Sequence, residues 1–262
     1  MRTQRVCITL LLGLVLQPVF ASSKVILIAT SQAHTVALLE LYTSEGCSSC
    51  PPAERYVKKL HTDGPGAQRF IPLAFHVDYW DQLGWKDPYS KAAYSTRQRD
   101  IARRNRSRAV FTPQIVLHGL NFPAYKNVAK AARLVNDIPA RASIQIQVQQ
   151  PASKRLRAIV RGKVLAKEDR PHAGVYLALY ENNLVEKISR GENSGKTLNH
   201  DFVVQEFFGP LRVDDQGSFV LEQDLSIGSE RIIANMGVVA FVQDLVDGSI
   251  LQALSLAFTA LP

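Results

Sequence analysis

The first half of the chain shows the hydrophobic pattern of an α/β protein. Short apolar runs rich in β-branched residues and leucine predict buried strands at 36–42, 70–77 and 114–117. Segments without proline that follow these runs predict helices at 53–60, 90–104 and 125–136. Strands that alternate with helices favour parallel pairing in an α/β layer.

The pattern changes near residue 140. After Pro139 the helical segments stop, and residues 143–149 (SIQIQVQ) alternate strictly between polar and apolar side chains. Further strands are expected at 156–165, 175–180, 202–208, 219–225, 238–243 and 250–258. Strands at this spacing predict a mainly antiparallel, β-sandwich-like domain over 140–262, which follows an α/β domain over 36–139.

The N-terminus has the order of a secretory signal peptide. A basic stretch over 1–5 precedes an apolar run, and Ala21 stands as a small residue at the expected cleavage position. We therefore predict a signal peptide over 1–21, a linker over 22–35, and a periplasmic or secreted protein. The apolar run is shorter than the roughly 20 residues of a membrane span. A second apolar patch at 25–29 supports an alternative, in which an uncleaved N-terminus anchors the protein to the inner membrane.

Charge narrows the range of partners. The chain carries 31 Lys and Arg against 23 Asp and Glu, a formal net charge of +8, which attracts anionic surfaces in general. The sequence has no basic strip interleaved with aromatic residues, so we do not expect a nucleic-acid partner. Several arginines between 97 and 108 would lower the pKa of a thiol that they faced. A solvated helix face is the commoner explanation for them.

Cys47 and Cys50 are the two cysteines that remain once residues 1–21 are removed. In an oxidising compartment such a pair forms a small disulfide, and its thiols can also hold a soft metal ion. Pro51 and Pro52 are tolerated only in the first turn of a helix, so the helix is expected to begin just before Cys50. Cys47 would then lie at the exposed cap and Cys50 further in, the asymmetry of a nucleophilic and a resolving thiol.

Further candidates stand at the ends of two predicted strands. Thr112 and Pro113 lead into the third strand, where a redox domain often carries a cis-proline that faces its disulfide. His76, Asp78 and Trp80 follow the second strand and are expected to flank the cysteines, because the carboxyl ends of parallel strands gather at one crevice. They could bind substrate or shuttle protons. In the alternative interpretation, Trp80 packs the following loop and the carboxylates cap turns.

Four runs of the chain resemble the exported thioredoxin-like proteins of the DUF1223 family: VALLELYTSEGCSSCPP, FHVDYWDQLGWKDPY, VFTPQIVLHG and GENSGKTLNHDFVV. The resemblance implies an α/β thioredoxin-like domain over 36–139, followed by the β-sandwich-like domain. It also implies a redox-active pair at Cys47 and Cys50 and a cis-proline at Pro113. Many thioredoxin-like proteins carry a buried acid that relays a proton for the resolving thiol, and Glu40 lies close to that place. The alternative is a glutamate that faces solvent at a sheet edge.

One glycine-containing run is not assigned a function. The run 191–195 has three residues between its glycines, where a phosphate loop has four, and no helix follows it. His200 and Asp201, which come after this run, are expected only to form hydrogen bonds in a loop.

We favour an exported thiol–disulfide oxidoreductase that acts on protein thiols and disulfides through Cys47 and Cys50. Pro113 would shape the substrate groove, a membrane protein is a candidate redox partner, and no cofactor is expected. The serines between the thiols leave the direction of electron flow open. One alternative is a copper-binding or metallochaperone module that uses the same cysteines, with His76 as a third ligand. Another is a redox-inert binding protein with a structural disulfide.

Overall fold

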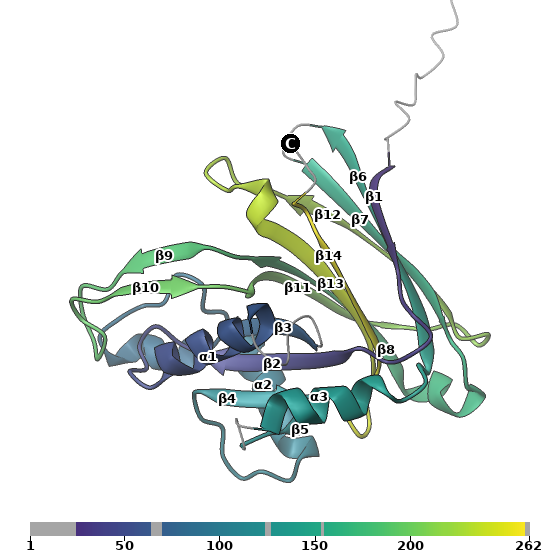
Figure 1. Cartoon of the computed structure of the whole chain (residues 1–262), viewed down its shortest axis with the longest axis horizontal. Helices are drawn as coiled ribbons and strands as arrows, with labels where there is room; N and C mark the ends of the chain where they lie inside the picture. Colours follow the sequence, from purple (N-terminus) through teal and green to yellow (C-terminus); the bar gives the residue numbers. More distant parts are fainter. Residues whose placement is uncertain (1–24, 64–69, 124–126, 153–154, 260–262) are drawn as a thin grey trace, which may run out of the picture.

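The computed structural model describes residues 25–63, 70–123, 127–152 and 155–259. The predicted signal peptide, residues 1–21, lies outside the described residues. Those residues form a β-rich α/β fold with few helices and with sheets of eight, four and two strands (Figure 1). No helix among them is long and apolar enough to cross a membrane.

The largest sheet has the strand order β14-β13-β8-β11-β3-β2-β4-β5. The first half of the chain supplies β2 (Ala37–Thr43), β3 (Phe70–His76), β4 (Gln114–Leu117) and β5 (Leu120–Asn121). The second half supplies β8 (Ala173–Glu181), β11 (Val203–Arg212), β13 (Met236–Asp244) and β14 (Ile250–Ala257). Val203 of β11 pairs with Ala74 of β3 in parallel. One sheet therefore runs through both predicted domains, and the boundary near residue 139 stays a prediction.

The strand predicted at 114–117 forms, but its direction differs from the prediction. β2 and β3 are parallel, with Thr43 opposite His76. β4 runs antiparallel to β2, with Gln114 opposite Tyr42, so the expected parallel pairing is wrong for this strand. The register gives the reason. The last residue of β3 and the first residue of β4 lie at the same edge of the sheet, because they are opposite the neighbouring residues Thr43 and Tyr42 of β2. The segment between β3 and β4 does not cross to the other edge, so β4 runs in the opposite direction.

Among the described residues, three α-helices cover the part of the large sheet that comes from the first half. They are α1 (Cys50–Thr62), α2 (Ala92–Arg104) and α3 (Val128–Asn136). α1 and α3 pack on one face, where Val57 and Ala132 join Leu39 in an apolar core. α2 packs on the other face, where Tyr94 and Leu38 belong to a second core. Successive residues of β2 thus point to opposite faces, as in any strand.

A four-stranded sheet with the order β1-β6-β7-β12 lies against the second half of the large sheet (Figure 1). Its strands are β1 (Val25–Thr30), β6 (Ala142–Ala152), β7 (Arg155–Val164) and β12 (Ser218–Ser226). Side chains of both sheets, including Ile144, Val160, Leu177 and Val238, form one buried apolar core. The predicted linker is wrong for residues 25–30, because β1 pairs antiparallel with β6.

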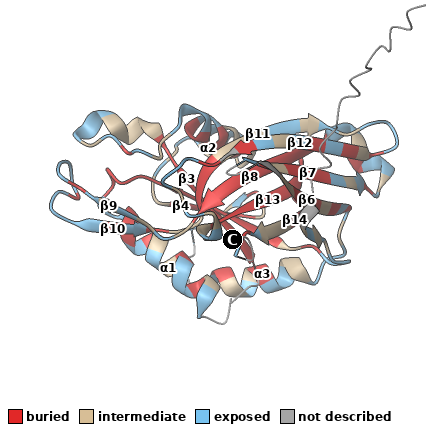
Figure 2. Ribbon diagram, turned by 90° about the horizontal axis from the view of Figure 1, so that it is seen from above, coloured by how far each residue is buried: buried red, intermediate tan, exposed pale blue. Residues whose placement is uncertain are grey.

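Short connecting elements complete the fold. Three 3-10 segments are described, η1 (Asp78–Leu83), η3 (Lys167–His172) and η4 (Ile233–Asn235). A hairpin of β9 (Leu184–Lys187) and β10 (Thr197–His200), absent from the sequence prediction, extends toward α1 (Figure 1). Figure 2 shows the central strands buried and this hairpin at the exposed edge of the molecule. We call residues 188–196, which connect β9 to β10, the hairpin loop.

Candidate functional site

Cys47 and Cys50 form a disulfide between the end of β2 and the start of α1, and their Cα atoms lie 5.5 Å apart. As predicted, the two prolines Pro51 and Pro52 occupy the first turn of α1, where backbone N–H groups lack partners within the helix. The hydroxyl oxygen of Ser49 lies 3.3 Å from the sulfur of Cys47. The local sequence therefore sets both sulfur atoms at the N-terminus of a helix.

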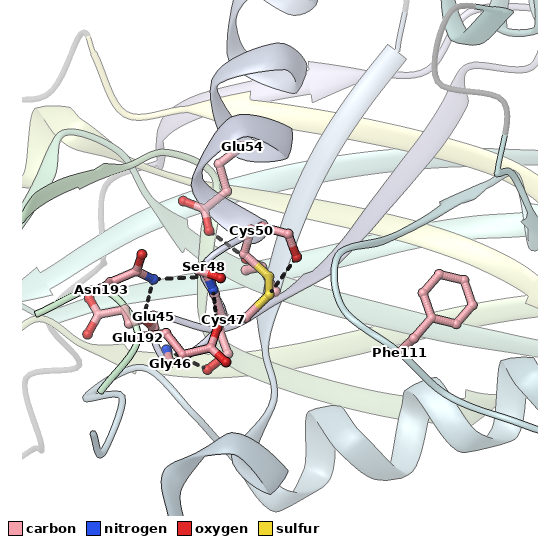
Figure 3. Close-up of a disulfide and its surroundings, with 12 residues drawn as sticks. Glu45, Gly46, Cys47, Ser48, Cys50, Glu54, Phe111, Glu192 and Asn193 are labelled. Carbon is pink, nitrogen blue, oxygen red and sulfur yellow. Dashed lines mark hydrogen bonds between the residues drawn. A yellow bond between two sulfur atoms is a disulfide. The ribbon is translucent and has the colours of Figure 1, made fainter. Parts of the chain in front are cut away.

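The hairpin loop binds the backbone of the disulfide turn. Cys47 is only 1% exposed, so its predicted place at an exposed cap is wrong. Asn193 of the hairpin loop donates from its amide to the backbone oxygens of Glu45, at 2.8 Å, and Cys47, at 3.0 Å (Figure 3). The backbone N–H of Ser48 donates to the carboxylate of Glu192 at 2.9 Å. The second half of the chain thus holds the backbone of the disulfide turn, and the local sequence around the cysteines gives no sign of these contacts.

The Thr112–Pro113 peptide bond is cis, as the sequence predicts. Because Gln114 is opposite Tyr42, Pro113 lies beside the end of β2, at the sheet edge that carries the disulfide. Phe111 is 44% exposed, and in the view of Figure 3 it lies across the disulfide from the hairpin loop. An exposed apolar side chain therefore lies on this side of the disulfide. Substrate contact by Thr112 stays a prediction.

The predicted site residues after β3 have different surroundings. A Cβ atom added to Gly46 would lie 3.2 Å from Cβ of Trp80, so Trp80 packs against the backbone next to the disulfide. Asp78 exchanges hydrogen bonds with the hydroxyl of Ser95 and thereby ties η1 to α2. Asp81 accepts a hydrogen bond from the hydroxyl of Ser90 at 2.7 Å. Substrate binding by Trp80 and Asp78 stays a prediction beside these packing and capping contacts.

Glu40 lies within the large sheet and is 1% exposed, so the alternative of a solvent-facing glutamate is wrong. Arg97 of α2 donates to both of its carboxylate oxygens, at 2.6 and 2.8 Å. Tyr42 donates to the same carboxylate at 2.8 Å, and burial together with Glu40 raises the pKa of this tyrosine well above its usual value. Glu40 therefore belongs to a buried ion pair on the α2 face, away from α1. Its role as a proton relay stays a prediction.

A cluster of two histidines and three carboxylates lies beside the disulfide turn. We call Glu45, Glu54, His76, Asp87 and His200 the histidine cluster; all but Glu54 are buried. His76 Nδ1 lies 2.7 Å from Asp87 Oδ2. His200 lies between two carboxylates, with Nδ1 2.6 Å from Glu54 and Nε2 3.0 Å from Glu45. The two imidazole rings meet edge to face, with centroids 5.2 Å apart.

The charges of the histidine cluster are strongly coupled. Burial alone would lower the pKa of His200, but hydrogen bonds to Glu45 and Glu54 raise it to about 10. Burial would raise the pKa of Asp87, but the facing His76 and backbone N–H donors keep it below its usual value. At neutral pH, His200 is therefore an imidazolium ion between two carboxylates, and Asp87 is ionised.

The histidine cluster also fixes the disulfide turn. The backbone N–H of Glu45 donates to Asp87 at 2.9 Å, and Trp85 Nε1 donates to the carboxylate of Glu45 at 2.6 Å. The hydroxyl of Thr43 donates to Glu54 at 2.5 Å. These bonds hold both ends of the segment that carries the cysteines, so the disulfide turn is bound by the histidine cluster as well as by the hairpin loop.

Of the residues in this cluster, only His76 is predicted as a site residue from the sequence. Glu45 lies two residues before Cys47, and Glu54 lies four residues, or about one helical turn, after Cys50. This closeness to the cysteines along the chain is the signal that could identify the two glutamates. His200 was interpreted as a loop residue without a role, but it is the centre of the cluster. Its signal was its place in the last of the four runs that resemble the family.

The fold and the site together define a β-rich α/β protein with a buried disulfide at the N-terminus of a helix. The model of a family described as "Protein of unknown function (DUF1223)" matches residues 38–243, and the chain belongs to this family. No curated protein matches the chain.

Two solved structures share the fold at low sequence identity. A protein from Agrobacterium tumefaciens has a TM-score of 0.59 and 19% identity, over 87% of this chain and 96% of its own. HBP35 of Porphyromonas gingivalis has a TM-score of 0.67 and 18% identity, over 87% of this chain and 76% of its own. At such identities the likeness concerns the fold alone.

Proposed function

We propose that the protein is an exported thiol–disulfide oxidoreductase that acts on protein substrates through Cys47 and Cys50. The observation that carries the proposal is the place of the disulfide, between the end of buried β2 and the N-terminus of α1. The cis bond before Pro113 at the neighbouring strand end supports it. The strand order β3-β2-β4-β5, with helices on both faces, supports a thioredoxin-like domain over 36–139. The strands that enclose the larger core support a β-sandwich-like second domain.

The reaction is an exchange of two electrons between two pairs of sulfur atoms. In the reducing direction, the thiolate of Cys47 attacks a partner disulfide, forms a mixed disulfide and releases one partner thiolate. The thiolate of Cys50 then attacks the sulfur of Cys47, which releases the second partner thiolate and forms the Cys47–Cys50 disulfide. The partner takes up two protons and two electrons, and an external dithiol restores the reduced pair. In the oxidising direction each step runs in reverse.

Two features of the turn favour the thiolate of Cys47. A helix N-terminus stabilises negative charge through its unpaired N–H groups and its dipole. The hydroxyl of Ser49, 3.3 Å from the sulfur of Cys47, can donate a hydrogen bond to the thiolate. The serine residues between the cysteines thus take part in setting the thiol pKa.

The hairpin loop restrains the turn that carries the disulfide. Asn193 and Glu192 bind the backbone of this turn, and Cys47 is 1% exposed. We propose that a protein partner approaches from the side of Phe111 and that release of the loop lets the turn move to expose the sulfur of Cys47. The second half of the chain would then control access to the disulfide, because its hairpin loop holds the turn.

Trapping of a mixed disulfide tests the proposal. Reduced Cys50→Ser protein keeps the attacking thiol and should form a stable mixed disulfide with a disulfide-containing protein such as insulin, detected on a gel without reductant. The matched Cys47→Ser variant should form none. Equal trapping by the two variants, or trapping by neither, would contradict the assignment.

A specific observation favours one alternative, a redox-inert protein with a structural disulfide. Both cysteines are almost fully buried, as structural disulfides often are. The reduction potential of the pair separates the two functions, because structural disulfides lie below about −300 mV and working couples lie above it. Equilibration of the purified protein with glutathione measures this potential. A value below the limit would replace the oxidoreductase with the structural alternative.

A further inference from the structure

Three potential ligand atoms converge inside the histidine cluster. They belong to Glu54 of α1, His76 of β3 and His200 of β10, and all lie within 4.8 Å of one another. Two imidazole nitrogens and one carboxylate oxygen form a donor set that zinc and other divalent first-row transition metals bind. We propose that Glu54, His76 and His200 bind one such divalent cation.

An unpartnered nitrogen points to a ligand at this place. His76 is 1% exposed, yet its Nε2 has no hydrogen-bond partner among the described residues. Its other ring nitrogen, Nδ1, faces a carboxylate oxygen of Asp87, which also accepts a backbone N–H from Glu45. This contact places a proton on Nδ1, and in the neutral ring Nε2 then presents a lone pair. A buried lone pair without a donor is an incomplete interaction, and a cation completes it.

The arrangement around both histidines is that of metal-ligating histidines. Such histidines donate their second ring N–H to a carboxylate, which fixes the ring and raises its basicity. Asp87 occupies this position for His76, at 2.7 Å. Glu45 occupies it for His200, at 3.0 Å from Nε2. Each of the two histidines therefore already has its outer partner, and both partners are themselves buried.

Charge balance also favours a cation. The carboxylates of Glu45, Glu54 and Asp87 outnumber the two imidazoles, so the cluster stays negative even with both rings protonated. A divalent ion would take the place of the proton between His200 Nδ1 and Glu54, 2.6 Å apart. Metal binding commonly releases ligand protons in this way.

The site is separate from the cysteines, and a pocket borders one of its three residues, Glu54. The disulfide ties up both sulfur atoms, so the proposed ligands are nitrogen and oxygen alone. A pocket of about 240 Å³ opens beside Glu54, and its lining also includes Lys58 and Asp201. A bound ion would join α1, β3 and β10, and would thereby hold the hairpin against the first half of the chain.

Zinc binding by the oxidised full chain tests the proposal. Equilibrium dialysis against Zn²⁺ should show one tightly held ion per chain. His76→Gln and Glu54→Gln should each weaken binding by at least about tenfold. His34→Gln, which removes an exposed histidine, is the matched control and should bind as the natural chain does. The proposal is wrong if the natural chain holds no ion, or if His76→Gln and Glu54→Gln bind as tightly as His34→Gln.

The absorption spectrum of bound Co²⁺ distinguishes this site from a cysteine site. The spectrum of the natural chain needs no substitution, so it remains informative if a variant fails to fold. The Co²⁺ complex of the natural chain should show visible absorption without the near-ultraviolet charge-transfer band of a thiolate ligand. The Cys47→Ser/Cys50→Ser double variant should bind Co²⁺ with the same spectrum. A thiolate band, or loss of binding in the double variant, would overturn the proposal and favour a metal at the cysteines. The result is independent of the proposed oxidoreductase activity, which the double variant lacks.

Discussion

The side-chain amide of Asn193 donates a hydrogen bond to the backbone oxygen of Cys47, 146 residues earlier in the chain, at 3.0 Å. The same amide donates to Glu45 at 2.8 Å. One residue of the second half thus holds the turn that carries Cys47.

Asn193→Ala should speed the reduction of the disulfide. The change removes two hydrogen bonds, each contributing about 0.5–1.5 kcal/mol, so the hairpin loop should open about tenfold more readily. The rate of thiol release in dithiothreitol, followed by alkylation, measures the effect. Ser194→Ala in the same loop removes an exposed hydroxyl that binds only Ser189 and should leave the rate unchanged. Equal rates for the two variants would mean that the loop does not limit access.

Arg97→Leu should destabilise the fold strongly. The change leaves the carboxylate of Glu40 buried without its partner, which typically costs about 3–5 kcal/mol. Arg103 lies on the same helix, pairs with Asp100 at the surface, and provides the control. Arg103→Leu should change the free energy of unfolding by less than about 1 kcal/mol. Urea denaturation measures both, and similar losses would contradict a buried ion pair.

His118 should lower the free energy of unfolding at acidic pH. Burial, aided by the positive charge of Arg141, lowers its pKa to about 4, from 6.5. The folded state therefore binds this proton less tightly than the unfolded state, so stability is full above 6.5, is lost as the pH drops from 6.5 to about 4, and levels off below that. The loss should reach roughly 3 kcal/mol.

Asparagine is the suitable substitution for His118, because His118 has a left-handed φ of 53° that asparagine tolerates. His118→Asn should flatten the pH dependence of the unfolding free energy across this range. His34→Asn, at an exposed position, should leave it intact. A profile unchanged by His118→Asn would assign the acid sensitivity to other groups.

Gly119→Ala should lower the free energy of unfolding more than Gly195→Ala does. Gly119 has a φ of +85°, and a Cβ atom there would overlap the backbone oxygen of Gly248. Gly195 has a φ of +80° with nothing near its Cβ position. Gly195→Ala should cost about 1–2 kcal/mol from backbone strain alone, whereas Gly119→Ala should cost about 3 kcal/mol or more. Equal thermal shifts would show that residues 119 and 248 do not approach so closely.

The features that sequence predicted are those with local causes. Pro51 and Pro52 restrict where a helix can begin, and α1 begins at Cys50. Mainly apolar runs predicted β2 and β3, which are buried throughout. The β9–β10 hairpin escaped prediction because its strands are only four residues long and half exposed, so their apolar pattern is too weak to stand out.

The features that sequence missed depend on contacts between distant segments. His200 lies 146 residues from Glu54 and 155 from Glu45, and only the folded sheet brings them together. The turn at Cys47 likewise binds residues 192 and 193, which lie more than 140 residues later in the chain. Spacing along the chain identifies groups that share one turn or strand, and it carries no information on such pairings.

The pairing of Val203 with Ala74 has a consequence for how the protein is made. A chain emerges from the ribosome N-terminus first, so β3 exists as an open edge strand well before β11 is available. Open apolar edges are prone to pair with other chains, so β3 is open to such pairing until β11 has been made. In the same interval Asn193 has not yet been synthesised, so its hydrogen bonds to the disulfide turn form only after both cysteines have left the ribosome. The segment that carries the cysteines therefore exists for a time without the contacts that later hold it.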